Sequence, residues 1–161
     1  MKISTILIII AVAIVLVVRF KLLSSSSDTL DSEIGTKSDI PRYIASLLKH
    51  GTEDDFLIIE IENSEDFFQF KNYQNELEID FPLVTDRQKT LESKVRQAFR
   101  DLNLEIIENK GSGDIIFLDS YIKQADSGAS TIVQEIFKSV FGLNENTKLV
   151  FRWTSFALIE S

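Results

Sequence analysis

The sequence predicts an α+β fold, in which an N-terminal transmembrane helix precedes one α-β-β-β-α-β-β-α-β domain with an antiparallel sheet. Three observations support this prediction. An uncharged apolar run opens the chain, three short segments with strand periodicity follow one another over residues 56–81, and three other segments repeat their apolar residues at helical spacing. With 161 residues, 44% of them hydrophobic, the chain can bury one core of ordinary size.

Residues 1–23 predict a membrane anchor. The run from Ile3 to Val18 carries no charge, and Arg19 and Lys21 follow it directly, as in a stop-transfer flank. The run alone would form a helix somewhat shorter than a hydrocarbon core of about 30 Å. Apolar residues up to position 23 extend it, so we expect residues 3–23 to bind the lipid bilayer as a single-pass segment.

A cleaved signal peptide is the alternative interpretation of this segment. Lys2 precedes the apolar run, and the serines at 24–27 follow it. The basic flank and the lack of an A-x-A-like cleavage site favour a segment that stays attached. Positive charges lie on both sides of the segment and give little orientation bias; we expect the domain to face the cytoplasm.

Residues 24–37 predict a flexible linker, because they are rich in serine and show no apolar period. The α+β domain is then expected over residues 38–161. Its first helix should begin behind a Ser38 or Asp39 cap, with Pro41 in the first turn, and end at Gly51.

Three strands are predicted over residues 56–63, 67–73 and 76–81, as an antiparallel meander with short turns. Strict alternation assigns one set of side chains to the core, namely Phe68, Phe70, Leu77, Ile79 and Phe81. Phe67, Gln69 and Tyr73 point the other way. On a polar surface these side chains would form a candidate partner-binding patch; the alternative is that a second element covers this face.

The second helix should begin at Thr85, whose side chain forms a capping box with Gln88. Its apolar stripe leaves Lys89, Arg96 and Arg100 together on the opposite side. These three cations are candidate binding residues for an acidic partner. A solvated face, partly paired with neighbouring acids, is the alternative.

The rest of the domain predicts a hairpin, a helix and a terminal strand. The hairpin covers residues 104–109 and 114–122 around a glycine-containing turn, and the helix starts near residues 127–130 and ends at Gly142. The apolar stripe of this helix covers about half its circumference, which indicates burial on two sides. Residues 147–159 predict one long or two short strands, with Leu149, Phe151 and Trp153 on one face.

Composition excludes several classes of function. Residues 24–161 have a formal net charge of −11, because all 25 acidic residues but only 14 of the 17 basic residues fall in this range, so we expect no nucleic-acid partner. The chain has no cysteine, and its single histidine, His50, ends the first helix, where the helix dipole explains a basic residue. Glu60 and Glu62 alone make a poor metal site. We therefore predict no catalytic residues, no metal and no cofactor.

The order of elements over residues 40–149 resembles the type III secretion chaperone-like fold, in particular the bacterial TY-Chap family. Four stretches are similar to it: "FLIIEIENSEDFFQF", "ELEIDFPLV", "LNLE" and "IVQEIFKSVFGL". The resemblance implies a domain that binds other polypeptides, commonly as a dimer, and is not an enzyme. The anchor and the segment after Gly142 are additions to that pattern.

These features together predict a membrane-anchored, non-enzymatic protein-binding module with a protein partner. The alternative is a small-ligand-binding domain or an enzyme, with a pocket between the sheet and the final helix. For the oligomeric state we expect a monomer, because the terminal strand with Phe151 and Trp153 can fold over the rest of the final helix's apolar stripe.

Overall fold

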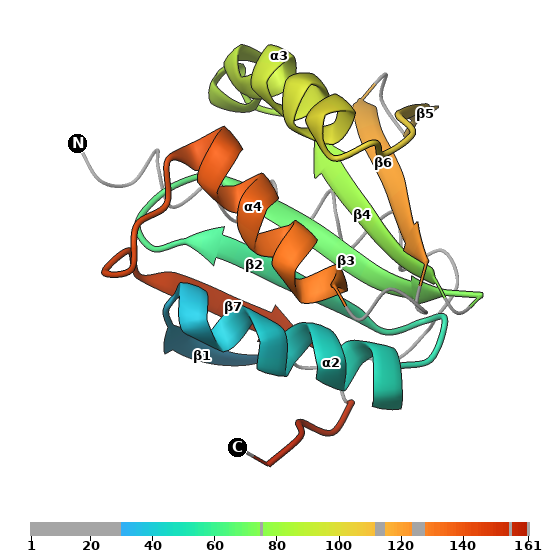
Figure 1. Ribbon diagram of the computed structural model, residues 1–161, viewed down its shortest axis with the longest axis vertical. Coiled ribbons are helices and arrows are strands. Elements are labelled where there is room, and N and C mark those ends of the chain that lie inside the picture. The colour runs from blue at the N-terminus through green and yellow to red at the C-terminus, as the bar shows by residue number, and fades with distance from the viewer. Residues whose placement is uncertain (1–29, 75, 112–114, 124–127, 155, 161) are drawn as a thin grey trace.

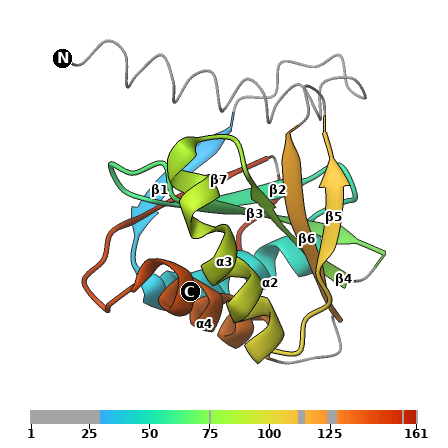
Figure 2. The same cartoon turned by 90° about the horizontal axis from the view of Figure 1, so that it is seen from above.

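The computed structural model describes residues 30–74, 76–111, 115–123, 128–154 and 156–160. Within them, a seven-stranded antiparallel sheet carries three α-helices on one face (Figures 1 and 2). The sheet order is β1-β7-β2-β3-β4-β6-β5. The predicted α+β class and antiparallel sheet are confirmed, whereas the predicted anchor at residues 1–23 lies outside the described residues.

Eleven elements make up the described fold. In chain order they are β1 (Asp31–Gly35), the 3₁₀ helix η1 (Lys37–Asp39), α2 (Ile40–His50), β2 (Phe56–Ile61), β3 (Phe67–Tyr73), β4 (Glu76–Pro82), α3 (Asp86–Asp101), β5 (Ile107–Lys110), β6 (Ile116–Lys123), α4 (Ala129–Phe141) and β7 (Leu149–Trp153).

The meander β2-β3-β4 forms as predicted, and its alternation places the predicted side chains in the core. Leu57 pairs with Phe70, which in turn pairs with Ile79. All five predicted core residues are almost completely inaccessible to solvent. The ring of Phe68 lies 5.3 Å from that of Phe137 and 5.4 Å from that of Phe141, so α4 packs directly on the middle of the sheet.

The prediction of a flexible linker over residues 24–37 is wrong where the structure describes this range. Asp31–Gly35 forms β1, an edge strand that pairs along its length with β7. Glu33 accepts a hydrogen bond from the Tyr43 hydroxyl and lies 3.5 Å from an Arg42 nitrogen. An edge strand needs little apolar content, because backbone pairing on one side satisfies its hydrogen bonds while its side chains remain in water.

β7 lies between β1 and β2, near one edge of the sheet (Figure 1). Its core side chains are those predicted, and the ring of Phe151 stacks on Tyr43 of α2, with centroids 4.0 Å apart. The strand therefore does not fold over α4 as the sequence suggested. The apolar stripe of α4 is covered instead by the sheet together with α2 and α3, because all four belong to one core.

The chain after β7 follows α2 instead of forming a second strand. The amide of Ile159 donates to the Ser46 hydroxyl at 2.9 Å, and the Arg42 Nε donates to the carbonyl of Ile159 at 3.3 Å. These two bonds hold the C-terminal residues against the outer side of the helix.

α3 begins at the predicted capping box. The Gln88 amide donates to the Thr85 hydroxyl, and the Gln88 side chain accepts from the Thr85 amide. Next to the cap, Arg87 binds both carboxylate oxygens of the buried Asp66, at 3.1 and 2.9 Å. The turn between β2 and β3 is thereby fixed to the start of α3.

Replacement of Ile79 by Asp should unfold the domain. Ile79 is 0% exposed, and an unpaired carboxylate in its place would cost several kcal/mol, a large part of a typical stability of about 5–15 kcal/mol. Glu78→Gln, one residue away on the other side of β4, is the matched control and should change the stability little. Urea unfolding followed by circular dichroism measures both; equal midpoints would contradict the register of β4.

Candidate functional site

The sheet has a second face, on the side opposite α2, α3 and α4 (Figure 2). We use "second face" for this surface throughout. A row of paired residues crosses it from strand to strand, consisting of Arg152, Ile58, Gln69, Asp80 and Asp119. Successive residues in this row come from β7, β2, β3, β4 and β6, so the face is assembled from distant parts of the chain.

A separate apolar cluster lies on the second face. Its buried members are Phe56, Ile58, Phe67 and Phe117, and the half-buried Leu30 and Ile115 pack against them. Phe67 is only 6% exposed, so the prediction that it lies on an accessible polar surface is wrong. The alternation along β3 is correct, but the face to which it points is buried.

Gln69 lies in the middle of this face and is 1% exposed. The prediction that it contributes to an accessible patch is therefore also wrong. Among the described residues, neither polar atom of its side chain has a hydrogen-bond partner. A buried amide without partners is destabilising by roughly 1–3 kcal/mol, so native proteins seldom keep one without a reason.

Asp119 shares this environment. Its carboxylate is buried and accepts a hydrogen bond from the Asn109 side chain, while its other oxygen, Oδ1, has no partner among the described residues. Asp119 is paired with Asp80 across β6 and β4, so two acidic residues are neighbours next to Gln69. The centre of the second face thus presents acceptor oxygens and an amide inside apolar surroundings.

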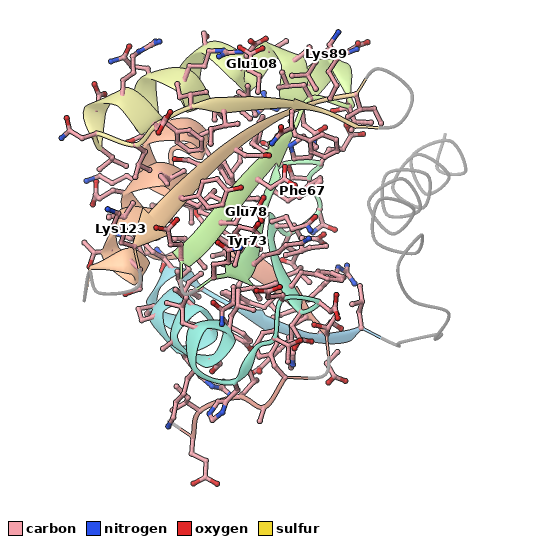
Figure 3. The ribbon with its side chains drawn as sticks, turned by 90° about the vertical axis from the view of Figure 1, so that its right-hand side faces the viewer. Phe67, Tyr73, Glu78, Lys89, Glu108 and Lys123 are labelled. Carbon is pink, nitrogen blue, oxygen red and sulfur yellow. The ribbon has the colours of Figure 1, made fainter. Side chains whose placement is uncertain are left out.

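One corner of the second face is accessible and aromatic, and we call it the tyrosine patch (Tyr73, Tyr121, Glu76, Glu78 and Lys123). Tyr73 is 42% exposed, and its ring lies 6.1 Å from that of Tyr121. The Tyr121 hydroxyl donates to Glu78 at 3.4 Å. Figure 3 shows Tyr73 and Glu78 near each other on the sheet. Of the three predicted residues on β3, only Tyr73 is accessible to a partner.

The three cations predicted as binding residues lie on α3, and Figure 3 shows one of them, Lys89, well apart from Tyr73. Arg96 bridges Glu92 and Glu108 at 2.8 and 2.7 Å, and so connects α3 to β5. Lys89 lies 3.8 Å from Asp86, and Arg100 donates to Gln97. The structure therefore favours the alternative of a solvated face partly paired with acids.

Asp119 and Tyr121 were not predicted as members of the second face. The segment that contains them was predicted as a strand, and its alternation alone places both on one side. Their proximity to Gln69 could not be predicted from neighbouring residues. It depends on the pairing of β6 with β4, and α3 and β5 separate these two strands in the sequence.

The described residues contain no group of three or more acidic or histidine side chains that could hold a metal ion. In the same part of the chain, no helix is long and apolar enough to cross a membrane.

Unfolding should become easier at alkaline pH through Tyr121. Burial raises the pKa of the Tyr121 phenol to about 12, and the charges of Glu78 and Asp119 add to this rise. The unfolded chain loses the proton near pH 10, before the folded chain does, so this contribution to stability is complete below about pH 10 and lost as the pH approaches 12. In Tyr121→Phe, the free energy of unfolding should fall less between pH 9 and 11. An unchanged pH dependence would contradict this environment for Tyr121.

Comparisons with protein-family models, with curated proteins and with solved structures find no match to this chain. The resemblance to the type III secretion chaperone-like fold and to the TY-Chap family stays a prediction. The surfaces of the domain bear on its function, because a fold alone does not determine what a protein does.

Proposed function

We propose that the chain is a membrane-anchored, non-enzymatic module that binds another protein through the tyrosine patch. Residues 3–23 hold it in the bilayer, with the domain on the cytoplasmic side. The observation that carries the proposal is the exposure of Tyr73 beside Tyr121 on a sheet face that is otherwise largely buried at its centre.

Tyrosine pairs of this kind suit a protein partner. A tyrosine ring offers a large rigid contact area together with a polar hydroxyl, and tyrosine is enriched at the centres of protein interfaces. Glu76, Glu78 and Lys123 surround the two rings with charges of both signs. A partner with an apolar side chain flanked by polar groups would be complementary to this surface.

Aromatic side chains occupy the space between the sheet and α4. This favours a binding site on the surface over a pocket in the interior. Rings from both elements fill this space: Phe68 and Phe70 of β3 lie 5.3 and 6.4 Å from Phe137 of α4. Phe141 contacts Phe68 and Phe137 from the end of the helix. This is the location that the small-ligand and enzyme alternatives would need.

Site-specific photo-cross-linking in intact cells tests the proposal. A photoreactive phenylalanine analogue replaces Tyr73 in the full-length chain, and membranes are then washed with carbonate and analysed for covalent adducts. We expect one discrete adduct of higher mass, retained in the washed membranes. The adduct should diminish when Tyr121→Ala is added, because the second ring of the patch is then missing.

The matched control places the same analogue at Ala45, which is exposed on α2 on the other side of the sheet. This control should give no discrete adduct. An equal adduct at both positions, or none at Tyr73, would contradict binding through the tyrosine patch. Release of the protein by the carbonate wash would contradict the membrane anchor.

A further inference from the structure

The centre of the second face is buried, although no described helix lies over it. All three described α-helices pack on the opposite side of the sheet (Figure 2). Nevertheless Phe117, Gln69 and Asp119 are as inaccessible as residues of the main core. The four apolar side chains of the second cluster would otherwise form a contiguous apolar patch, which soluble surfaces seldom leave in water.

The place where the chain enters the described fold indicates what covers this face. Leu30, the first described residue, packs against the apolar cluster of the second face, and β1 begins at the next residue. The described fold therefore begins on this side of the sheet. The N-terminal apolar segment ends at Leu23, so only residues 24–29 separate it from the cluster.

The dimensions of this segment match the face. As a helix, the uncharged residues 3–18 would be about 24 Å long, and residues 3–23 about 30 Å. A seven-stranded sheet is about 29 Å wide at a strand spacing of about 4.8 Å. The short connection also gives the segment a high effective concentration at this face.

Charge is complementary as well. The apolar run is followed by Arg19 and Lys21, whereas the centre of the second face holds the neighbouring acids Asp80 and Asp119. Asp119 Oδ1 and the carbonyl oxygen of Gln69 can each accept a hydrogen bond from a basic side chain. A buried carboxylate gains most from such a partner, because no water competes for it.

We propose that the second face is the docking site for the chain's own residues 3–23 whenever this segment is outside a bilayer. Docking covers the apolar cluster, and it supplies a basic side chain to Asp119, whose Oδ1 has no hydrogen-bond partner among the described residues. Insertion into a membrane competes with docking, since one segment cannot occupy both places. The domain thus shields its own anchor before insertion. This inference goes beyond the proposed function and does not depend on the identity of any partner.

Cross-linking between engineered cysteines tests the proposal, because the natural chain has no cysteine. Gln69→Cys is combined in the full-length chain with one of four consecutive changes, Val12→Cys, Ala13→Cys, Ile14→Cys or Val15→Cys. Four consecutive positions sample all sides of a helix at 100° per residue. Each variant is treated with a short bismaleimide in detergent-free buffer, and the products are identified by electrophoresis and peptide mass.

We expect an intramolecular cross-link, at monomer mass, in at least one of the four variants. Addition of phosphatidylcholine vesicles before the reagent should reduce its yield at least severalfold, because insertion removes the segment from the sheet. Arg19→Glu combined with Lys21→Glu should also reduce the yield. The matched control replaces Gln69→Cys with Lys94→Cys, at an exposed position of α3, and should give no monomer-mass product.

Several outcomes would overturn the proposal. The first is that none of the four variants gives a cross-link above the control. The second is a product only at dimer mass, and the third is a protein that forms only aggregates without detergent. A product at dimer mass would show that a second copy of the chain binds the second face. If Gln69→Cys alters the circular dichroism spectrum, Tyr73→Cys replaces it, because that side chain is exposed on the same face. Loss of the monomer product with an unchanged Tyr73 photo-adduct in cells would overturn this inference alone.

Discussion

The pairing of β7 between β1 and β2 is the interaction on which the rest of the structure depends. It joins the last described strand to the first described one and to the meander, so that one sheet connects the two ends of the described fold. The stack of Phe151 on Tyr43 then fixes α2 against this part of the sheet, with Glu33 of β1 bound to the same tyrosine. Without β7, β1 would have no partner strand, and β2 would become an edge.

A sheet of this width has two faces to cover, and the described helices cover one. The first face holds the main core, in which Phe68 contacts both Phe137 and Phe141. The second face combines an apolar cluster with buried polar groups at Gln69 and Asp119 and an accessible corner at Tyr73. This division suggests distinct roles: the buried centre for a segment of the chain itself, and the exposed corner for a partner. Both roles depend on the same strand register.

The sequence pattern predicts those parts of the fold that depend only on residues close together in the sequence. The alternation of Leu77, Ile79 and Phe81 and the capping box of Thr85 require only neighbouring residues, and both are present. β1 was not predictable in this way, because its stability comes from backbone bonds to a strand more than a hundred residues later. The same holds for the site: the direction of Gln69 follows from alternation, but its burial and its position near Asp119 follow from pairing across the sheet. Tyr73 lies at the end of β3, beyond Lys71, the last residue of this strand that pairs with β2, and it pairs only with Glu76 of β4.

The central claim is that the centre of the second face is as inaccessible to water as the main core, whereas Tyr73 at its corner is accessible. Hydroxyl-radical footprinting of the full-length protein in detergent-free buffer without vesicles, read by mass spectrometry at single residues, measures this directly, because phenylalanine and tyrosine rings both react when water reaches them. The account predicts that Phe67 and Phe117 are protected to the same degree as Phe68, while Tyr73 reacts many times faster. Modification of Phe67 and Phe117 at the rate of Tyr73 would show that the second face is open to water and would contradict the account.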